Sequence, residues 1–259
     1  MRYITVHPEM VWSDQVDVVC IDDGLAGLLC AIAVAAHGAT VMLAAQPRHS
    51  RPWFEAVRGD PATSAYLAEL SADIDSTDVA HPTPGDDVLP VRPVRPHQIA
   101  TTGRRRRIVP PFDGGRLRQW TAECTASATG YLYTRVTDWP SEQVQTADGD
   151  LLEVTEYTVP AEVTGSYEKL HGWLTAQAAE LGVHAHPVEK VERLVFDETS
   201  VSGVVFGASG ASLAVRARHG VLMCGTSGAA MTVAEPAERL ALVGRAASRF
   251  GRVELLTTG

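Results

Sequence analysis

The chain has 259 residues, of which 45% are hydrophobic and 20% charged, enough material for one large domain or a core with an insertion. Its formal net charge of −9 makes nonspecific binding to nucleic acid unfavourable, because a duplex is itself densely negative. No apolar run approaches the roughly 20 residues that cross a bilayer, and the N-terminus lacks a signal-peptide pattern. We therefore expect a cytoplasmic protein without a membrane span.

The N-terminal segment has the pattern of a strand, a tight turn, a helix and a second strand. The apolar run Val16 to Ile21 predicts a strand that is buried on both faces of a parallel sheet. The stretch Leu25 to Ala36 is rich in Ala and Leu and predicts a helix, and Thr40 to Ala44 predicts the second strand. Two strands and one helix within about 30 residues match the first unit of a Rossmann-like domain.

After these elements the pattern changes. Asp60 and Pro61 supply a cap and a first-turn proline, which predict a short helix over residues 62–72. Seven prolines lie between Pro82 and Pro111, so we expect an extended surface loop there, outside the core.

The next stretch predicts one helix and two strands. Residues 115–123 are helical in pattern, while 131–136 and 151–159 alternate like strands of a smaller sheet. This stretch therefore predicts an inserted cap.

The C-terminal part returns to a core-like rhythm. Residues 167–183 carry a helical apolar stripe, and 188–196 and 201–207 predict a strand pair around a polar turn. We expect two further strands within 212–225 and a final helix over 235–250.

Four stretches, in this order, resemble the flavoprotein family that includes fumarate reductase flavoprotein subunits and 3-ketosteroid dehydrogenases. They are VWSDQVDVVCIDDGLAGLLCAIAVAAHGATVMLA, VPPFDGGRLRQW, LTAQAAELGVHAHPVEKVERLVFDETSVSGVVF and RARHGVLMCGT. The resemblance implies an α/β, Rossmann-like FAD/NAD(P)-binding fold with a parallel central sheet and a small inserted α+β cap. The core would comprise residues 1–58 and 160–259, and the cap 59–159. A complete family member is roughly twice as long, and its C-terminal half finishes the flavin site and the substrate pocket.

The glycine fingerprint of the resembled family is altered here. Gly24 and Gly27 match its second and third glycines, but Asp22 occupies the first, and Asp23 adds a second carboxylate. One carboxylate about 4 Å from a phosphate repels it by roughly 4 kcal/mol at an effective dielectric constant near 20. The acid that binds the nucleotide ribose at the end of the second strand is replaced by Ala45.

These departures leave two interpretations of the turn. In one, a carboxylate of Asp22 or Asp23 caps the free N–H groups of the following helix, so that the protein supplies its own anion. In the other, an FAD site persists, adapted by relaxation or by a basic neighbour. FAD is the one cofactor that the sequence suggests, and Asp22, Asp23 and Ala45 all oppose its binding.

Other candidate residues also carry two interpretations each. Tyr131 and Tyr133 share one strand face and could line a pocket or polarise a ketone, or they could simply pack the cap sheet. Asp113 either caps the following helix or, as the resemblance implies, lies near substrate. Gly225 ends the last core strand, which approaches the flavin in the resembled family, although Thr226 departs from the expected glycine pair.

Metal chemistry has no support in the sequence. Four cysteines lie in apolar or mixed segments without a CxxC pair, which predicts buried thiols: Cys20, Cys30, Cys124 and Cys224. No histidine has a cysteine or acidic cluster at metal-ligand spacing beside it, so we assign no metal ligand.

Three functional hypotheses remain open. The first is a flavoprotein-like chain with a degraded dinucleotide site, acting as a non-redox or partner-dependent subunit or binding module. The second is a functioning FAD-dependent dehydrogenase of a steroid-like or alicyclic, hydrophobic small molecule. The third is a cofactor-free isomerase of an unsaturated ketone.

The shortened length also predicts a partner. An uncovered sheet would expose apolar faces and strand edges, so we expect a homo-oligomer or a complex with a second chain. The contact would lie near Gly220 to Gly225 and near Val253, Leu255 and Leu256, which have no later element to cover them.

Overall fold

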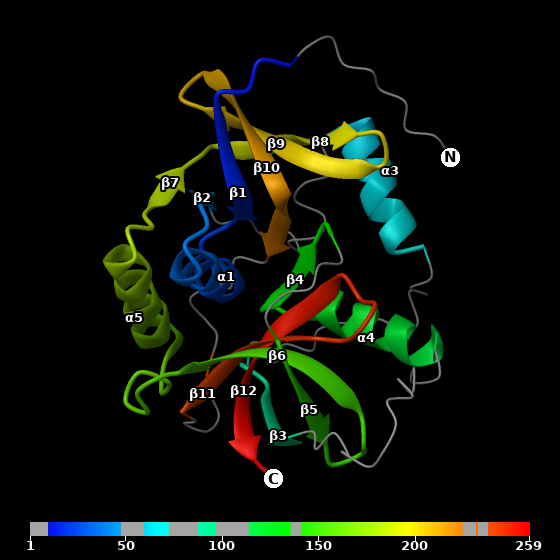
Figure 1. Ribbon diagram of the computed structural model, residues 1–259, viewed down its shortest axis with the longest axis vertical. Helices are drawn as coiled ribbons and strands as arrows, with labels where there is room; N and C mark the ends of the chain where they lie inside the picture. Colours follow the sequence, from blue (N-terminus) through cyan, green and yellow to red (C-terminus); the bar gives the residue numbers. More distant parts are fainter. Residues whose placement is uncertain are drawn as a thin grey trace.

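The computed structural model describes residues 10–47, 60–72, 88–96, 114–135, 141–224, 232 and 238–259 (Figure 1). One mixed, 12-stranded sheet dominates this part of the chain. Four α-helices accompany it there: α1 (Leu25–Ala36), α3 (Pro61–Leu70), α4 (Gly114–Ala126) and α5 (Tyr167–Glu180). The strands are β1 (Asp14–Ile21), β2 (Val41–Ala45), β3 (Val91–Pro96), β4 (Gly130–Tyr133), β5 (Glu142–Thr146), β6 (Leu151–Thr158), β7 (Ala185–Pro187), β8 (Lys190–Asp197), β9 (Ser200–Ala208), β10 (Ala211–Cys224), β11 (Arg239–Gly244) and β12 (Phe250–Thr258).

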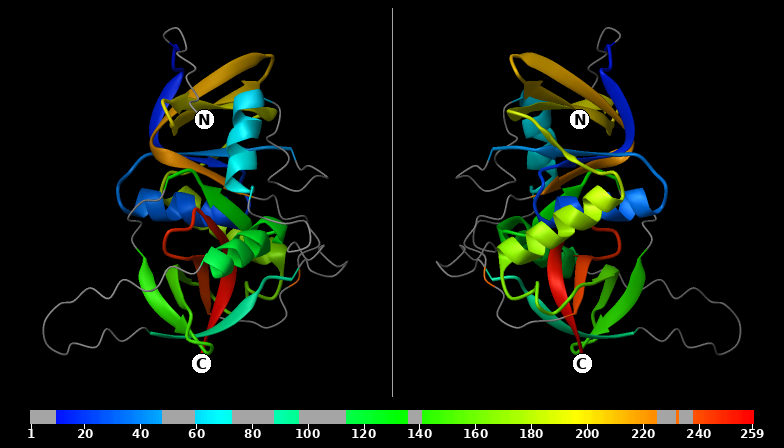
Figure 2. Two further views of the ribbon diagram at one scale, coloured as in Figure 1. Left: turned by 90° about the vertical axis from the view of Figure 1, so that its right-hand side faces the viewer. Right: turned by 90° about the vertical axis from the view of Figure 1, so that its left-hand side faces the viewer.

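Four neighbouring strands, in the order β7-β2-β1-β10, run parallel to one another. The predicted strand, helix and second strand at the N-terminus are confirmed, and α1 has the bounds expected from the sequence. Every residue of α1 from Leu25 to Val34 is buried, because the helix packs on β1, β2 and β10 and against α5. Figure 2 shows α1 and α5 side by side, with α3 beside the hairpin of β8 and β9.

Five strands, which lie in the lower part of Figure 1, pair with one another in a closed cycle. Their pairings run β3-β5-β6-β11-β12 and return from β12 to β3; we call this set the ring. Strand β4 pairs with β12 of the ring on one side and with β10 on the other, so it joins the ring to the parallel strands. Strands from the middle of the sequence therefore continue the same sheet as the terminal strands, and the division into core and cap stays a prediction.

The expected final helix over residues 235–250 is wrong, because β11 and the start of β12 occupy its described part. Leu240 and Leu242 face one hydrophobic cluster, and Ala241 and Val243 face another. Strand β11 is buried on both faces between β6 and β12, and such a short apolar run has no periodicity that separates strand from helix.

The proline-rich segment is also not a surface loop throughout. Strand β3 lies within it, and Val94 is fully buried. Its neighbours change along its length, with β12 alongside up to Val94 and β5 alongside from Val94 onward. Among the described strands, Pro93 therefore has β12 alone as its neighbour, and the missing proline N–H leaves no gap between two of these strands.

The predicted pair of strands within 212–225 is a single strand. Strand β10 lies beside β1 for most of its length, while its first part also pairs with β9 and its last part with β4. The polar residues Arg216, Arg218 and His219 mark the change of neighbour rather than a strand end.

The C-terminal segment packs within the chain. It therefore does not leave the uncovered apolar surface on which the predicted interface depends. Strand β12 contains three buried apolar residues, Val253, Leu255 and Leu256. It pairs with β11, and it also pairs with β4 at its start and with β3 at its end. The four cysteine thiols are buried, as predicted, and they are free. Within the described ranges, no helix is both long and apolar enough to span a membrane.

Candidate functional site

The turn between β1 and α1 holds the first candidate site. Asp22 is 3% exposed and has a backbone φ of 93°, in the left-handed region that favours glycine. Its carboxylate oxygen Oδ1 accepts a hydrogen bond from the backbone N–H of Gly24, at 2.9 Å. An aspartate that accepts from the residue two positions later forms an Asx-turn, so the side chain helps to hold its own strained backbone.

This bond differs from the helix cap that the sequence suggested. Gly24 is the N-cap residue of α1, and as a glycine it has no side chain with which to cap the helix. The carboxylate of Asp22 instead accepts from the N–H of the N-cap residue itself. It still places a negative charge among the N–H groups at the start of the helix.

Gly27 has no room for a side chain. A Cβ there would overlap the carbonyl oxygen of Asp22 and would lie 3.3 Å from Sγ of Cys224. The thiol of Cys224 in turn donates to the carbonyl of Ile21, at 3.2 Å. Burial, followed by the charge of Asp22, raises the pKa of this thiol well above its ordinary value, so it stays protonated. Gly27 thus allows α1 to pack closely on the ends of β1 and β10.

Asp23 and Ala45 complete the predicted nucleotide site. The backbone carbonyl of Asp23 accepts a hydrogen bond from Nε2 of His171, at 2.9 Å, which ties the turn to α5. Ala45 ends β2 beside Pro187 of β7, and its methyl group offers neither a donor nor an acceptor for a ribose hydroxyl. Asp113 and Gly225, the other two residues singled out, lie outside the described ranges.

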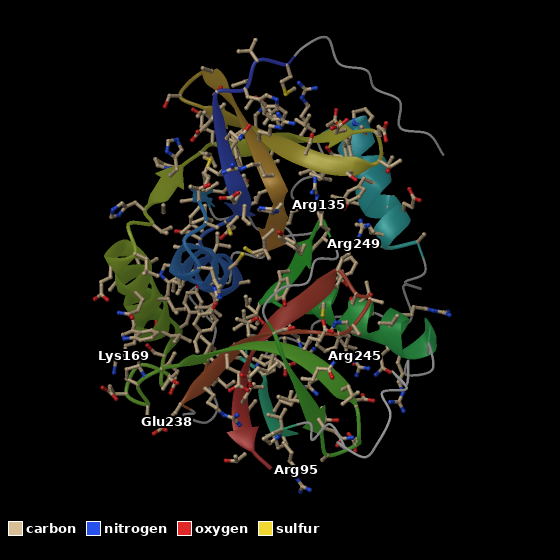
Figure 3. The ribbon with its side chains drawn as sticks, in the orientation of Figure 1. Arg95, Arg135, Lys169, Glu238, Arg245 and Arg249 are labelled. Carbon is tan, nitrogen blue, oxygen red and sulfur yellow. The ribbon has the colours of Figure 1, made fainter. Side chains whose placement is uncertain are left out.

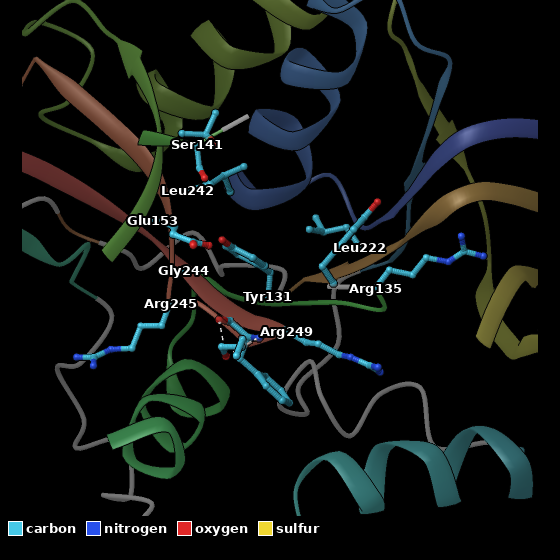
Figure 4. A pocket seen from close by; sticks show the side chains of 14 residues that line it. Tyr131, Arg135, Ser141, Glu153, Leu222, Leu242, Gly244, Arg245 and Arg249 are labelled. Atoms are coloured by element: carbon cyan, nitrogen blue, oxygen red, sulfur yellow. Dashed lines mark hydrogen bonds between the residues drawn. The ribbon is translucent and has the colours of Figure 1, made fainter. Parts of the chain in front are cut away.

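A second candidate site lies where β4 joins the ring to the parallel strands (Figure 4). A partly open cavity of about 100 Å³, which we call the seam cavity, is formed there. Its lining residues come from β4, β6, β10, β11 and the start of β12 with adjoining loops: Tyr131, Tyr133, Arg135, Ser141, Glu153, Thr155, Leu222, Leu242, Gly244, Arg245, Ala247, Ser248, Arg249 and Phe250. Both tyrosines singled out from the sequence therefore line one cavity.

The hydroxyl groups of the two tyrosines are engaged with the backbone. Tyr131 donates to the carbonyl of Val243 at 3.2 Å, and Tyr133 donates to the carbonyl of His219 at 3.1 Å. Burial raises the pKa of Tyr131 well above its ordinary value. Both side chains therefore present their rings to the cavity, while their protons are directed at carbonyl oxygens.

Sequence reasoning missed the residues that the ring contributes to this cavity. Glu153 and Gly244 lie opposite one another on β6 and β11, far apart in the chain. The alternation of Glu153 and Thr155 in β6 shows that they share a face, but nothing local shows what that face meets. Figure 3 shows Arg135 and Arg249 near the same junction.

A polar cavity of about 300 Å³ lies beside the ring, against α4. Three of its charged groups pair with one another: Asp150 bonds both Arg245, at 2.6 Å, and Arg116. Arg245 also lies over the ring of Trp120, with 5.4 Å between the guanidinium carbon and the ring centroid. Among the residues that the structure describes, no cluster of His, Cys, Asp and Glu is suited to a metal ion.

Comparison with known proteins gives remote structural likenesses. No family model matches the chain, and no curated protein matches it. A 3-ketosteroid-Δ4-(5α)-dehydrogenase from Rhodococcus jostii RHA1 is 18% identical over 85% of this chain and 48% of its own, with a TM-score of 0.36. A myxobacterial chondrochloren halogenase, a variant of FAD-dependent halogenases, is 17% identical over 79% and 36%, with a TM-score of 0.31. A flavin-dependent brominase is 16% identical over 78% and 36%, with a TM-score of 0.29.

The chain spans less than half the length of each of these proteins. At TM-scores below 0.5 the likenesses support no inference about this chain.

Proposed function

We propose that this chain is a binding module with the strand, turn and helix of a dinucleotide-binding fold but without a working dinucleotide site. The four parallel strands would be the core of a Rossmann-like, FAD-binding type of fold, with residues 59–159 inserted as its cap. The observation that carries the proposal is the hydrogen bond from the Gly24 N–H to the Asp22 carboxylate. An N–H group that a dinucleotide phosphate would need is already bound to an anion of the protein.

The residues of the turn do not fit FAD. Asp22 is buried at the turn, where its charge would lie close to the pyrophosphate and repel it. Ala45 supplies no group for the ribose, and the close packing of Gly27 on the Asp22 carbonyl leaves the turn little freedom to move. We therefore propose a role that does not depend on flavin chemistry.

The two enzyme hypotheses receive less support. A steroid-like substrate does not fit a cavity of about 100 Å³, since drug-sized ligands occupy pockets of about 300–1,000 Å³. A ketone isomerase would need a tyrosine proton aimed at its substrate, whereas Tyr131 and Tyr133 donate to backbone carbonyls. The seam cavity is better suited to binding a small molecule than to proton transfer.

Absorption spectroscopy tests the proposal directly. We expect the purified chain to lack the visible bands of oxidised flavin and to remain without them after incubation with excess FAD and gel filtration. A yellow protein with one flavin per chain would refute the proposal and would favour the FAD-dependent dehydrogenase.

A homo-oligomer or a partner chain is a separate part of the proposal. The terminal strand β12 does not support an oligomer, because the apolar residues of this strand are covered within the chain. Multi-angle light scattering of the purified protein, alone and after co-expression with products of neighbouring genes, decides it: a 27.7 kDa particle in both cases would exclude the partner.

A further inference from the structure

We propose that the seam cavity binds a neutral molecule of about one ring in size that carries a hydroxyl group, such as a phenol or a cyclic alcohol. This inference deepens the proposed function, because it names the ligand class of a binding module. It rests on the size of the cavity, on its apolar walls and on the placement of its charged groups.

The size of the cavity limits the ligand to a single ring. Its volume is about 100 Å³, and it is partly open to solvent. An engineered protein cavity of about 150 Å³ admits benzene, so a six-membered ring can enter the seam cavity if part of it remains at the mouth. A fused ring system would need several times this volume.

The walls of the cavity favour an apolar body. Tyr131 and Tyr133 of β4 present aromatic rings, and Leu222, Leu242 and Phe250 complete the apolar surface. Because the tyrosine hydroxyls bond backbone carbonyls, the rings are held in place before any ligand arrives. A ring that packs among these side chains removes apolar surface from water without disturbing them.

One carboxylate points into the cavity. Figure 4 shows the carboxylate of Glu153 and the hydroxyl end of Tyr131 pointing toward one another, while the guanidinium ends of Arg135 and Arg245 point away. A carboxylate has about four lone-pair sites, so Glu153 can accept a bond from a ligand in addition to any protein donor. A hydroxyl group on the ligand would supply that donor.

Two of the guanidinium groups donate from a terminal nitrogen to protein acceptors, whereas the buried Nε atoms of Arg135 and Arg245 have no hydrogen-bond partner among the described residues. Arg249 donates to the hydroxyl of Tyr66 at 3.1 Å, and Arg135 donates to the carbonyl of Arg218 at 3.1 Å. The positive charges around the cavity and the negative charge of Glu153 act in opposite directions on a charged ligand, because each attracts one sign and repels the other. A neutral donor avoids both repulsions, and this is why we choose a hydroxyl over an amine or a carboxylate.

The test measures how four probes of similar size bind to the intact chain. The probes are phenol, toluene, benzylamine and benzoate. Saturation-transfer NMR would measure their relative affinities at neutral pH. We expect phenol to bind about tenfold more tightly than toluene, as one hydrogen bond to a charged group predicts, and more tightly than either charged probe. Stronger binding of benzylamine or benzoate, equal binding of toluene, or no binding of phenol would overturn the proposal.

Two variants locate the binding. Gly244→Leu fills the cavity, and the backbone accepts it, because a Cβ there meets no atom closer than 3.9 Å. Gly172→Leu is the matched control, since a Cβ at this exposed helix position meets nothing within 4 Å. Gly244→Leu is expected to abolish phenol binding and Gly172→Leu to leave it unchanged; equal affinities of the two variants would overturn the placement.

A third variant tests the carboxylate. Glu153→Leu removes the acceptor, so phenol and toluene should then bind with equal affinity; a retained preference for phenol would refute the role of Glu153. The outcome of the FAD experiment does not depend on these binding measurements. A yellow protein would refute the proposed function whatever phenol does, and a colourless protein that ignores phenol would refute the ligand class alone.

Discussion

Oδ1 of Asp22 lies 2.9 Å from the backbone nitrogen of Gly24, and this bond places an anion of the protein inside the β1–α1 turn. If this charge excludes a dinucleotide, the double variant Asp22→Gly with Asp23→Gly should bind FAD more tightly. We expect a gain of at least about tenfold, because each carboxylate near a phosphate costs up to roughly 4 kcal/mol. Fluorescence quenching of FAD would measure it.

Asparagine variants provide the matched control for this experiment. Asp22→Asn with Asp23→Asn removes both charges but keeps a side-chain acceptor and a residue type that tolerates positive φ. The asparagine variant should recover most of the gain if charge is decisive. No gain in either variant would show that the obstacle lies elsewhere, for example at Ala45.

Gly27 should be intolerant of even one methyl group. The Cβ of Gly27→Ala would meet the carbonyl oxygen of Asp22, which is backbone and cannot move aside freely. We expect the free energy of unfolding to fall by about 2–3 kcal/mol, as measured by urea denaturation.

The control for Gly27 is another helical glycine. Gly172 lies in α5, and a Cβ there meets nothing within 4 Å. Gly172→Ala should therefore raise the free energy of unfolding by about 0.5–1 kcal/mol, because alanine is the better helix former. Similar effects at both positions would contradict the close packing of α1.

The parts of the fold that the sequence predicted are those with local signals. The length of α1, the cap at Asp60 and the stripe of α5 all depend on residues a few positions apart. Strands β11 and β3 were missed, since each is defined by partners elsewhere in the chain. Nothing in the local sequence of the proline-rich segment shows that one stretch of it pairs as a strand of the five-stranded ring.

The candidate sites divide in the same way. The departure at Asp22 was visible in the fingerprint, but its bond to the Gly24 N–H depends on a backbone angle that a sequence does not show. Tyr131 and Tyr133 were singled out because alternation places them on one face. Their companions Glu153 and Gly244 were not, because the ring that brings them to β4 forms only through distant pairings.

Thr63 of α3 should matter through its hydroxyl group. This fully buried hydroxyl accepts the backbone N–H of Leu194 in β8 at 2.9 Å and donates to Asp60 at 3.1 Å. Thr63→Val keeps the volume but leaves the N–H without its acceptor, so we expect a loss of about 1–3 kcal/mol in the free energy of unfolding.

Serine at the same position separates the hydroxyl from the methyl group. Thr63→Ser keeps the acceptor for Leu194 and should lose only about 1 kcal/mol for the buried methyl. Thermal and urea unfolding of the two variants would rank them. A serine variant as unstable as the valine variant would show that packing, and not the bond to β8, is what Thr63 contributes.

Glu254 of β12 should link stability to acid pH. Its side chain is fully buried and bonds both Arg92, at 2.8 Å through Oε1, and Arg252, at 2.6 Å. Burial alone would raise the pKa of Glu254, but the hydrogen bonds and charges of the two arginines outweigh it and hold the pKa below its ordinary value of 4.5. The unfolded chain therefore binds this proton more readily than the folded chain does.

The direction of the pH effect follows. The stabilisation from Glu254 should be complete above about pH 4.5 and should be lost as the pH falls from there through the lowered folded pKa. Glu254→Gln leaves two arginines without their buried anion, so at pH 7 we expect a loss of about 3–5 kcal/mol in the free energy of unfolding, and a weaker dependence of stability on pH below 4.5.

The control is a more exposed ion pair. Glu156→Gln, which breaks the half-exposed pair with Arg239 at 3.3 Å, should cost less than about 1 kcal/mol. Urea unfolding at several pH values would compare the three proteins. A Glu254 variant that keeps the full acid sensitivity of the parent would show that other carboxylates carry it.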